Sequence, residues 1–445
     1  MSKTTVPYRK MSGPTLSDRG TEYSATQAGE TVIWDVISNL WHPQENPDGY
    51  VSLGVAENAL MHSELRDFLN SKRLLEDRSL TYGDGPTGCK PLRSILSSFL
   101  NSKLNPVMPI KPEHIIATNG VTTAIEHSSW ALANPGDGIL LGRPYYRAFI
   151  ADIGLRTGVK VVPVSFGEID PCSPSCVEKY DEALNESNQK GVKIRALMLC
   201  HPHNPLGRCY PKETIIELMK LCQKYNIHLI SDEIYAFSVW KNTIDELKEE
   251  PVGFQSVLSI DTKGIIDPGL AHVLWGMSKD FGANGVRIGF LISQNNEPFL
   301  KAVRTCGLHS SPSSLAENAA AEVLGNEEFV ERYTKTNQER LSEAYAYGVK
   351  KVKEHGMEHV PGVNAAFFLW VNLGKVWREK HPEEAGKVDG EAITDVIFQK
   401  MMKNKVYVVT GDAAGAEEPG WFRLVFSQPK DLVDEGIKRI AEAIS

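Results

Sequence analysis

The sequence predicts an α/β protein with a mostly parallel sheet in a large domain, and a second, smaller α+β domain. Between residues 115 and 292, short runs of isoleucine, valine and leucine alternate with segments of helical spacing, a pattern typical of a parallel sheet covered by helices on both faces. Beyond about residue 310 the pattern changes to a long charged helix, then strands and helices in mixed order. A chain of 445 residues suits one large domain and a smaller one.

The strands of the large domain can be followed along the chain. Those we expect are HIIAT (114–118), GILLG (138–142), KVVPVSF (160–166), IRALMLC (194–200), IHLIS (227–231), HVLWG (272–276) and VRIGFLI (286–292). Residues 119–133 and 211–226 carry apolar residues at helical spacing between these runs, so we expect helices there. The second helix has Pro211 where a first turn tolerates proline.

The two ends of the chain have other patterns. After residue 310 we expect a charged helix (326–355), a strand (365–373), a helix (391–403), two strands (406–410 and 421–426) and a last helix. Residues 1 to about 30 are polar and lack a period, as mobile segments do. We therefore expect a mobile N-terminal segment (1–30), an N-terminal part of the small domain (31–70), the large domain (71–310) and a C-terminal small domain (311–445).

Composition narrows the class of protein. Hydrophobic residues make up 42% and charged residues 23%, as in ordinary globular enzymes, and the net charge of −8 with no basic block argues against a nucleic-acid partner. The chain has neither an apolar stretch long enough to span a bilayer nor the apolar core of a signal peptide, so we expect no membrane partner and a cytoplasmic location. Seven cysteines without zinc-like spacing indicate reduced thiols and no metal site.

Polar residues recur where the predicted strands end. The turn Gly120–Thr122 follows the strand at 114–118, Asn204 follows 194–200, Asp232 follows 227–231, and Lys279 follows 272–276. Ligands of open α/β sheets bind beyond the carboxyl ends of the strands, so we expect these residues at one rim. The turn also opens a helix, and a helix N-terminus suits a phosphate.

A lysine at such a rim has a specific chemistry. A desolvated lysine loses its proton readily and can form a Schiff base with an aldehyde. A buried aspartate could protonate a ring nitrogen, and an asparagine with a tyrosine could hold a phenolate oxygen. These are the requirements of pyridoxal phosphate, an electron sink for carbanions.

Several segments carry a resemblance to a known family. SKDFGANGVRIG (278–289) resembles the Schiff-base lysine segment of fold-type-I pyridoxal-phosphate enzymes of the class I/II aminotransferase superfamily, and NPLG, SDEIYA and PYY resemble their cofactor segments. GVAEN (54–58) and GWFRLVF (420–426) resemble segments of the 1-aminocyclopropane-1-carboxylate (ACC) synthase-like branch. The resemblance runs from about residue 50 to 427 and implies a seven-stranded sheet in the large domain and bound pyridoxal phosphate.

The resemblance also implies roles around the cofactor ring. Lys279 would form the Schiff base and later move protons, and Asp232 would pair with the pyridine nitrogen. Asn204 and Tyr235 would bond the phenolic oxygen. Tyr146 would stack on the ring, with Tyr145 as the alternative if the register differs by one.

Further roles concern the phosphate and the substrate. The residues implied at the phosphate are Val121, Thr122, Ser278 and Arg287. Arg423 would bind the α-carboxylate of an amino-acid substrate, and Glu57 would lie near the substrate's sulfonium or amine end. Tyr82 matches a tyrosine that serves in catalysis and substrate binding by reaching the neighbouring subunit's phosphate, which implies a homodimer with shared active sites.

Three features depart from the family pattern. Gly276 stands three residues before the lysine, where many relatives have a serine that bonds the phosphate. His201 replaces an asparagine, and residues 83–88 are longer than in plant ACC synthases. These changes leave the cofactor set nearly whole and put the substrate in question.

The reaction stays open between three readings. The sequence favours a carbon–sulfur bond-cleaving lyase, which forms ACC from S-adenosylmethionine or a thiol from a cysteine-type conjugate, as in fungal sulfur-metabolite synthesis. Glu57 favours this reading, since its charge would attract a cationic leaving group. The alternative is an α-amino acid aminotransferase. The third is a catalytically dead binding module, against which the complete set of site residues argues.

Overall fold

The structure is a computed structural model that describes residues 16–26, 28–386, 388 and 390–445. The chain divides into two compact units, residues 1–52 and residues 53–445. The described elements of the first unit are α1 (Asp18–Thr26), α2 (Ala28–Ser38) and β1 (Val51–Ser52). Of the segment that the sequence predicts to be mobile, residues 1–15 lie outside the described residues.

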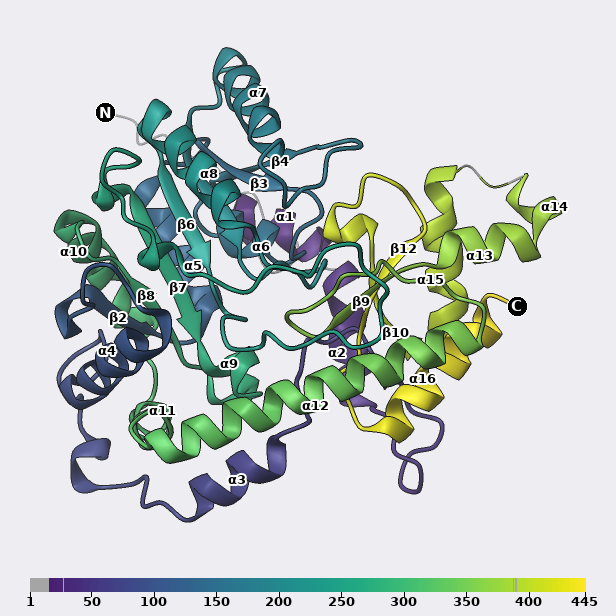
Figure 1. The fold of residues 1–445 in the computed structure, drawn as a ribbon, viewed down its shortest axis with the longest axis horizontal. Coiled ribbons are helices and arrows are strands. Elements are labelled where there is room, and N and C mark those ends of the chain that lie inside the picture. Colours follow the sequence, from purple (N-terminus) through teal and green to yellow (C-terminus); the bar gives the residue numbers. More distant parts are fainter. Residues whose placement is uncertain (1–15, 27, 387, 389) are drawn as a thin grey trace, which may run out of the picture. The chain divides into compact units, whose positions relative to one another are not determined.

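A seven-stranded sheet forms the centre of the second unit, as predicted (Figure 1). Its strands are β2 (Ile115–Thr118), β3 (Gly138–Gly142), β4 (Lys160–Val164), β5 (Ile194–Cys200), β6 (His228–Asp232), β7 (Ala271–Gly276) and β8 (Gly289–Ile292). Their order is β2-β8-β7-β6-β5-β3-β4, and only β8 runs antiparallel to its neighbours. Because β8 alone is reversed, β2, β5, β6 and β7 all end at the same edge.

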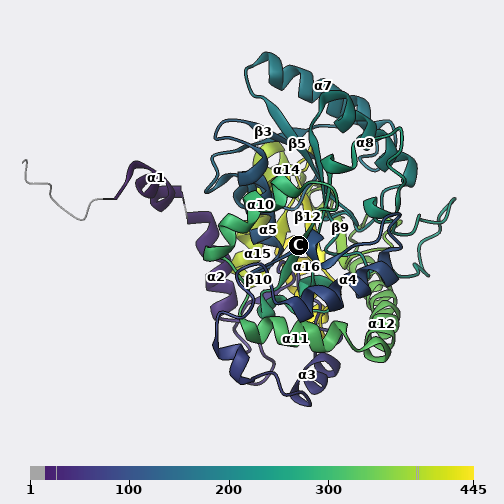
Figure 2. The same cartoon turned by 90° about the vertical axis from the view of Figure 1, so that its left-hand side faces the viewer.

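Helices cover this sheet and build the rest of the unit. They are α3 (His62–Asn70), α4 (Lys90–Leu104), α5 (Val121–Leu132), α6 (Phe149–Gly154), α7 (Cys176–Gln189), α8 (Lys212–Tyr225), α9 (Met277–Asp280), α10 (Glu297–Cys306), α11 (Ser314–Leu324), α12 (Glu327–Glu354), α13 (Leu373–Lys380), α14 (Pro382–Ala385), α15 (Ile393–Lys403) and α16 (Lys430–Ala443). Helices α7 and α8 lie side by side (Figure 2), and Lys224 of α8 pairs with Asp181 of α7. None of the helices in the described part of the chain is long and apolar enough to cross a membrane.

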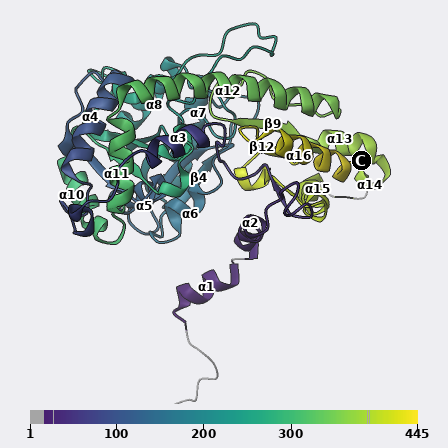
Figure 3. The same ribbon diagram turned by 90° about the horizontal axis from the view of Figure 1, so that it is seen from below.

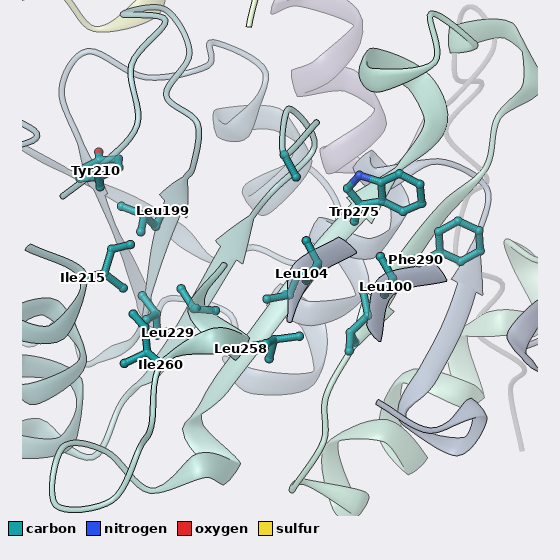
Figure 4. Close-up of a cluster of buried hydrophobic side chains, with 14 of the residues drawn as sticks. Leu100, Leu104, Leu199, Tyr210, Ile215, Leu229, Leu258, Ile260, Trp275 and Phe290 are labelled. Carbon is teal, nitrogen blue, oxygen red and sulfur yellow. The ribbon is translucent and has the colours of Figure 1, made fainter. Parts of the chain in front are cut away.

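The core lies where helices pack on the large sheet. Figure 4 shows Leu100 and Leu104 of α4 near Trp275 of β7 and Phe290 of β8. The rings of Trp275 and Phe290 stack with centroids 5.9 Å apart, and both side chains are fully buried. Burying an aliphatic or aromatic side chain of this kind contributes about 1.5–3 kcal/mol. This packing fixes β7, and therefore the turn after it that carries Lys279.

A second, three-stranded antiparallel sheet lies in the C-terminal part. Its order is β11 (Val409–Thr410), β12 (Trp421–Val425) and β9 (Phe368–Asn372), and Arg423 lies opposite Trp370 in the register. Helix α12 runs from α11, beside the large sheet, to α16, beside the small one (Figures 1 and 3). One helix of 28 residues therefore connects the two sheets.

Three predicted strands differ most in the structure, and one of them, expected at 365–373, begins only at Phe368. The strand expected at 286–292 begins only at Gly289, because residues 284–286 form a turn of 3₁₀-helix and Arg287 has a left-handed φ of 56°. The strand expected at 406–410 is two short strands, β10 (Val406–Tyr407) and β11. It is interrupted because the Tyr407 carbonyl accepts the Leu53 N–H at 2.9 Å, which turns the chain away from β12.

Candidate active site

Lys279 lies in a short helix directly after β7. Its side chain is partly buried, and its Nζ donates a 2.6 Å hydrogen bond to the carbonyl of Ala56. Burial lowers the pKa of Lys279 to about 8, and the positive charges of Arg423 and Arg287 act in the same direction. A substantial fraction of this amine is therefore neutral near neutral pH, as a nucleophile or base requires.

Asp232 ends β6, the central strand of the large sheet, which lies beside β7. Its side chain is 4% exposed, and its Oδ1 accepts only a 3.3 Å hydrogen bond from the Ile234 N–H. Burial raises the pKa of Asp232 to about 7, and the charges of Asp152 and Glu233 add to this effect. No basic side chain of the described residues forms an ion pair with Asp232, so its environment suits an incoming cation.

Asn204 joins two other polar side chains at the end of β5. Its Oδ1 accepts a 3.0 Å hydrogen bond from Arg423, and its Nδ2 lies 3.4 Å from the hydroxyl of Tyr235. All three side chains are at most 4% exposed. The sequence placed these residues at one site, and the structure brings them into direct contact.

Arg423 is a buried cation in β12 without an acidic partner among the described residues. Its Nη2 donates to the Gly54 carbonyl at 2.6 Å, its guanidinium lies 4.5 Å above the ring of Phe368, and its Nε has no partner. Burial lowers the pKa of Arg423 below its usual range. A buried charge of this kind favours an anionic ligand.

The segment 54–58 connects the lysine to the arginine. The Gly54 carbonyl accepts from Arg423, and the Ala56 carbonyl accepts from Lys279 and, at 3.1 Å, from Asn284. Glu57 is exposed, but its negative charge is near enough to raise the pKa of Lys279. This segment therefore forms one wall of the site.

The first turn of α5 provides the anion-binding end. Gly120 precedes the helix with φ 83°, and the guanidinium of Arg287 packs so closely on it that a Cβ at this position would collide. A Cβ on Gly289 would lie 2.5 Å from the Val121 nitrogen, so β8 approaches the same turn. Free N–H groups, a positive helix end and a guanidinium make a site for a phosphate.

Thr122 and Ser278 flank this turn. Thr122 is exposed, and its hydroxyl donates at 3.4 Å to Asp152 of α6. Ser278 is buried in α9, directly before Lys279. Thr122 therefore belongs to the first turn of α5, and Ser278 belongs to the helix that follows Gly276, a residue packed against Val121.

The two adjacent tyrosines point to different neighbours. Tyr145 donates its backbone N–H to the Ala414 carbonyl at 2.7 Å, and its ring packs directly against Gly415. Tyr146 is instead close enough to Asp232 and Arg423 that their charges act on its pKa, which burial raises. Tyr146 is thus the tyrosine that faces the site.

Tyr82 is the one predicted site residue that the single chain does not bring to the others. Its side chain is 100% exposed, in a loop between the 3₁₀ turn at 77–80 and α4.

Comparison with known proteins shows which family the chain belongs to. The family model "Aminotransferase class I and II" matches residues 50–440. The chain belongs to the class I and II aminotransferase family. The cofactor of this family is pyridoxal phosphate, so this chain is a pyridoxal-phosphate-dependent member of the aminotransferase superfamily.

The similar proteins include several that are named ACC synthases or ACC synthase-like proteins. The chain is 30% identical over 420 residues to ACC synthase 7 of Arabidopsis thaliana, covering 91% of this chain and 89% of that protein. It is 30% identical to a protein named probable aminotransferase sirI of Leptosphaeria maculans, covering 93% and 95%. It is 31% identical to a mouse protein named probable inactive ACC synthase-like protein 2, covering 88% and 65%.

Two further comparisons concern length and fold. The chain spans 65% of that mouse protein's length and 63% of the length of ACC synthase-like protein 1 of Takifugu rubripes. A mutant aspartate aminotransferase of Thermus thermophilus shares the fold, with a TM-score of 0.72 at 21% identity over 97% of this chain and 100% of that one.

The residues of this chain fit the family's cofactor. The buried Asp232 carboxylate has no ion-pair partner among the described residues. The turn at Gly120, against which the Arg287 guanidinium packs closely, suits a phosphate, and the pKa of Lys279 is lowered. Asn204 and Tyr235 are the pair of neutral donors that a phenolic oxygen requires.

Two departures from the family pattern have structural explanations. A Cβ on Gly276 would lie 2.8 Å from the Ile288 carbonyl and 2.9 Å from Val121 Cγ2, so the family's serine does not fit here without a shift. His201 is fully buried, with Nε2 bonded to the Gln255 carbonyl at 3.0 Å and Nδ1 accepting from the Tyr210 N–H at 3.2 Å. Burial lowers the pKa of His201 to about 4, so it is a neutral structural residue.

Sequence reasoning missed several contributors to the site. The carbonyls of Gly54 and Ala56 carry no sequence signal, because any residue has a carbonyl. Arg147 was also missed, although it directly follows Tyr146; its positive charge lowers the pKa of Arg423. The signal that could have identified Arg147 is a positively charged residue directly after the PYY segment (144–146).

Proposed function

We propose that this enzyme cleaves a carbon–sulfur bond in a sulfur-containing α-amino acid. The observation that carries the amino-acid part is Arg423, a buried guanidinium whose hydrogen bonds go to an amide and a carbonyl and not to a carboxylate. A substrate α-carboxylate would supply the missing anion through charge-assisted bonds.

Each residue then has a defined task. Lys279 would hold the cofactor, and its amine would remove the proton from the substrate α-carbon. Bound pyridoxal phosphate supplies an electron sink for the carbanion. Asp232 keeps the ring nitrogen protonated, Asn204 and Tyr235 hold the phenolic oxygen, and Tyr146 covers the ring face.

The remaining residues would bind the cofactor phosphate and the substrate. Val121 through its backbone, together with Thr122, Ser278 and Arg287, would hold the phosphate at the α5 N-terminus. Thr122 already orients its hydroxyl toward a charged neighbour, Asp152, and would turn toward the phosphate. The substrate would lie between this end and Arg423.

Glu57 supports cleavage at sulfur. It is the acidic residue of the 54–58 wall, and its charge already acts on Lys279. A carboxylate there lowers the free energy of a positively charged sulfur substituent. The similarity to the Arabidopsis ACC synthase supports the same reading.

An aminotransferase is the second candidate. The similarity to the sirI protein supports it, since that relative is named a probable aminotransferase and is covered over 95% of its length. The same residues would serve, and the side chain of the substrate, including any sulfur substituent, would be retained in the product. An inactive protein on this fold is disfavoured by the presence of Lys279, Asp232 and Arg423 together.

In a homodimer, Tyr82 would contact the second copy of the chain. Tyr82 is fully exposed, and Leu80 and Leu308 are each 75% exposed. The loops that carry them are close, because a Cβ on Gly307 would lie 2.8 Å from the Pro86 carbonyl. Burying these apolar side chains against a second copy would bring Tyr82 to that copy's phosphate.

All seven cysteines are free thiols, which supports the cytoplasmic location expected from the sequence.

One assay separates the candidates. The holoenzyme is incubated with S-adenosylmethionine, a neutral cysteine S-conjugate or a simple amino acid, and the products are identified. ACC, or pyruvate with a free thiol, would support carbon–sulfur cleavage, whereas a keto acid that retains sulfur would assign an aminotransferase. Glu57→Gln should reduce turnover of the sulfonium substrate more than that of the neutral conjugate, and equal effects would remove Glu57 as the sulfonium-binding residue.

A further inference from the structure

Asp280 directly follows Lys279 and is a buried acid that the proposed chemistry leaves unused. Its side chain is 3% exposed. Its Oδ1 accepts a 2.7 Å hydrogen bond from the Ser238 hydroxyl. Its Oδ2 accepts from the Trp275 Nε1 at 2.9 Å and from the Phe237 N–H at 3.2 Å. Two of these donors come from the segment after β6, and the third comes from Trp275 in β7.

The segment 237–238 continues from a cofactor residue. The Ser238 N–H donates to the Tyr235 carbonyl at 3.0 Å, which closes a turn that begins at Tyr235. Asp280 therefore connects the lysine turn to the turn that carries Tyr235.

The same segment also contacts the wall beneath the arginine. The Ser238 carbonyl accepts the Ala366 N–H at 2.8 Å. Two residues later Phe368 begins β9, and its ring lies 4.5 Å below the Arg423 guanidinium. A continuous path of contacts thus leads from Lys279 through Asp280 and Ser238 to the side chain proposed to bind the substrate carboxylate.

The lysine turn needs such support because it is short. Helix α9 has only four residues, so its backbone has few hydrogen bonds of its own. The Phe281 N–H bonds to the Met277 carbonyl at 3.2 Å, and the Gly282 N–H bonds to the Lys279 carbonyl at 3.2 Å. These bonds fix the turn internally but not its position relative to Tyr235.

A residue that only filled space at this position would not need a charge. Asp280 is only 3% exposed, so its carboxylate is desolvated, and this burial raises its pKa to about 7. Desolvating an acid is costly unless its hydrogen bonds are made, and here three donors converge on it. The arrangement favours an acceptor of defined geometry over an apolar side chain.

We propose that Asp280 is a positioning residue, which holds Lys279 in a fixed relation to Tyr235 and to the wall beneath Arg423. It acts through hydrogen bonds and transfers no proton itself. The inference rests on the proposed function only in taking Lys279 and Tyr235 as the groups that meet the cofactor.

The test compares Asp280→Asn with Asp280→Ala. An asparagine keeps one oxygen for the N–H groups of Trp275 and Phe237, and the Ser238 hydroxyl can turn to accept from its amide, so its geometry should be retained. An alanine loses all three bonds. The first readout is the pH midpoint of the bound cofactor's absorbance, which reports the surroundings of Lys279 and Tyr235 and needs no substrate.

We expect Asp280→Asn to keep the wild-type midpoint and Asp280→Ala to shift it by about one pH unit, a tenfold change in the underlying equilibrium. With a turned-over amino acid, Asp280→Ala should lower kcat on the order of tenfold to a hundredfold, as expected when a reacting group moves by about 1 Å. If the substrate proposed above is wrong, the absorbance result still stands.

Asp245→Ala is the matched control. Asp245 is also a buried carboxylate with several partners, since it accepts from Asn242 at 2.8 Å, Tyr345 at 2.6 Å and His359 at 3.1 Å. Its removal should lower Tm as Asp280→Ala does, but should leave the absorbance midpoint and kcat unchanged. A wild-type midpoint and kcat in Asp280→Ala, or equal shifts in Asp245→Ala, would overturn the proposal. If Asp280→Ala does not fold, Ser238→Ala should shift the midpoint in the same direction by less, and a wild-type midpoint there would overturn it.

Discussion

Arg423 donates a 3.0 Å hydrogen bond from Nη1 to Oδ1 of Asn204, a residue 219 positions earlier in the chain. The same amide lies 3.4 Å from the Tyr235 hydroxyl. The groups proposed for the substrate carboxylate and for the cofactor's phenolic oxygen therefore share one asparagine. A change in the position of Arg423 should be felt at both.

Arg423→Lys should weaken substrate binding. A lysine cannot reproduce the two parallel bonds that a guanidinium makes to a carboxylate. Charge-assisted bonds contribute about 1.5–3 kcal/mol each, so KM should rise on the order of tenfold to a hundredfold. Steady-state kinetics with an accepted amino acid measures this. An unchanged KM would show that the carboxylate binds elsewhere.

The pKa of Lys279 predicts how the free protein takes up pyridoxal phosphate. The amine must be neutral to attack the aldehyde, and burial lowers its pKa to about 8. The uptake rate should therefore rise with pH through about 8 and level off above it. Stopped-flow absorbance from pH 6 to 10 measures the rate, and a midpoint near that of an ordinary lysine would contradict the assignment.

Two substitutions test the causes of that pKa. Arg423 lowers the pKa of Lys279, whereas Glu57 raises it. Arg423→Gln should therefore move the uptake midpoint to higher pH, and Glu57→Gln should move it to lower pH. Shifts in the same direction would mean that these charges do not act on Lys279.

Asp232→Asn should keep the cofactor bound but slow the chemistry. A neutral amide cannot hold the ring nitrogen in its protonated form, so the carbanion loses its electron sink. We expect α-proton exchange to fall on the order of a hundredfold or more, as when a preorganised electrostatic group is removed. Exchange of a deuterated substrate followed by NMR is the measurement. A rate near that of the wild type would show that Asp232 does not serve the ring.

The sequence predicted the strand ends well because each one joins two strong local signals, an apolar run and a polar residue after it. Asp232, Lys279 and Asn204 were found in this way. The resemblance favoured Tyr146 over Tyr145, but the sequence gave no sign that the Tyr145 ring would pack against Gly415, far along the chain. It also gave no sign that Ser238 would bond to Asp280, because neither periodicity nor turn chemistry specifies a partner 42 positions away.

Gly276→Ala should destabilise the protein. A Cβ there would lie 2.8 Å from the Ile288 carbonyl and 2.9 Å from Val121 Cγ2. Overpacking of this kind typically costs about 1–3 kcal/mol. Gly285→Ala is the control, since its Cβ would have no atom within 4 Å. Denaturant unfolding measures both, and equal stabilities would show that the β7 end has room for a side chain.

The central claim is that Lys279 holds pyridoxal phosphate at the rim formed by β2, β5, β6 and β7. Borohydride reduction of the holoenzyme makes the link permanent, and peptide mapping by mass spectrometry then locates it. The account predicts a pyridoxyl group on Lys279 and a Lys279→Ala protein that loses nearly all turnover. A pyridoxyl group on any other lysine, or a protein that takes up no cofactor, would contradict it.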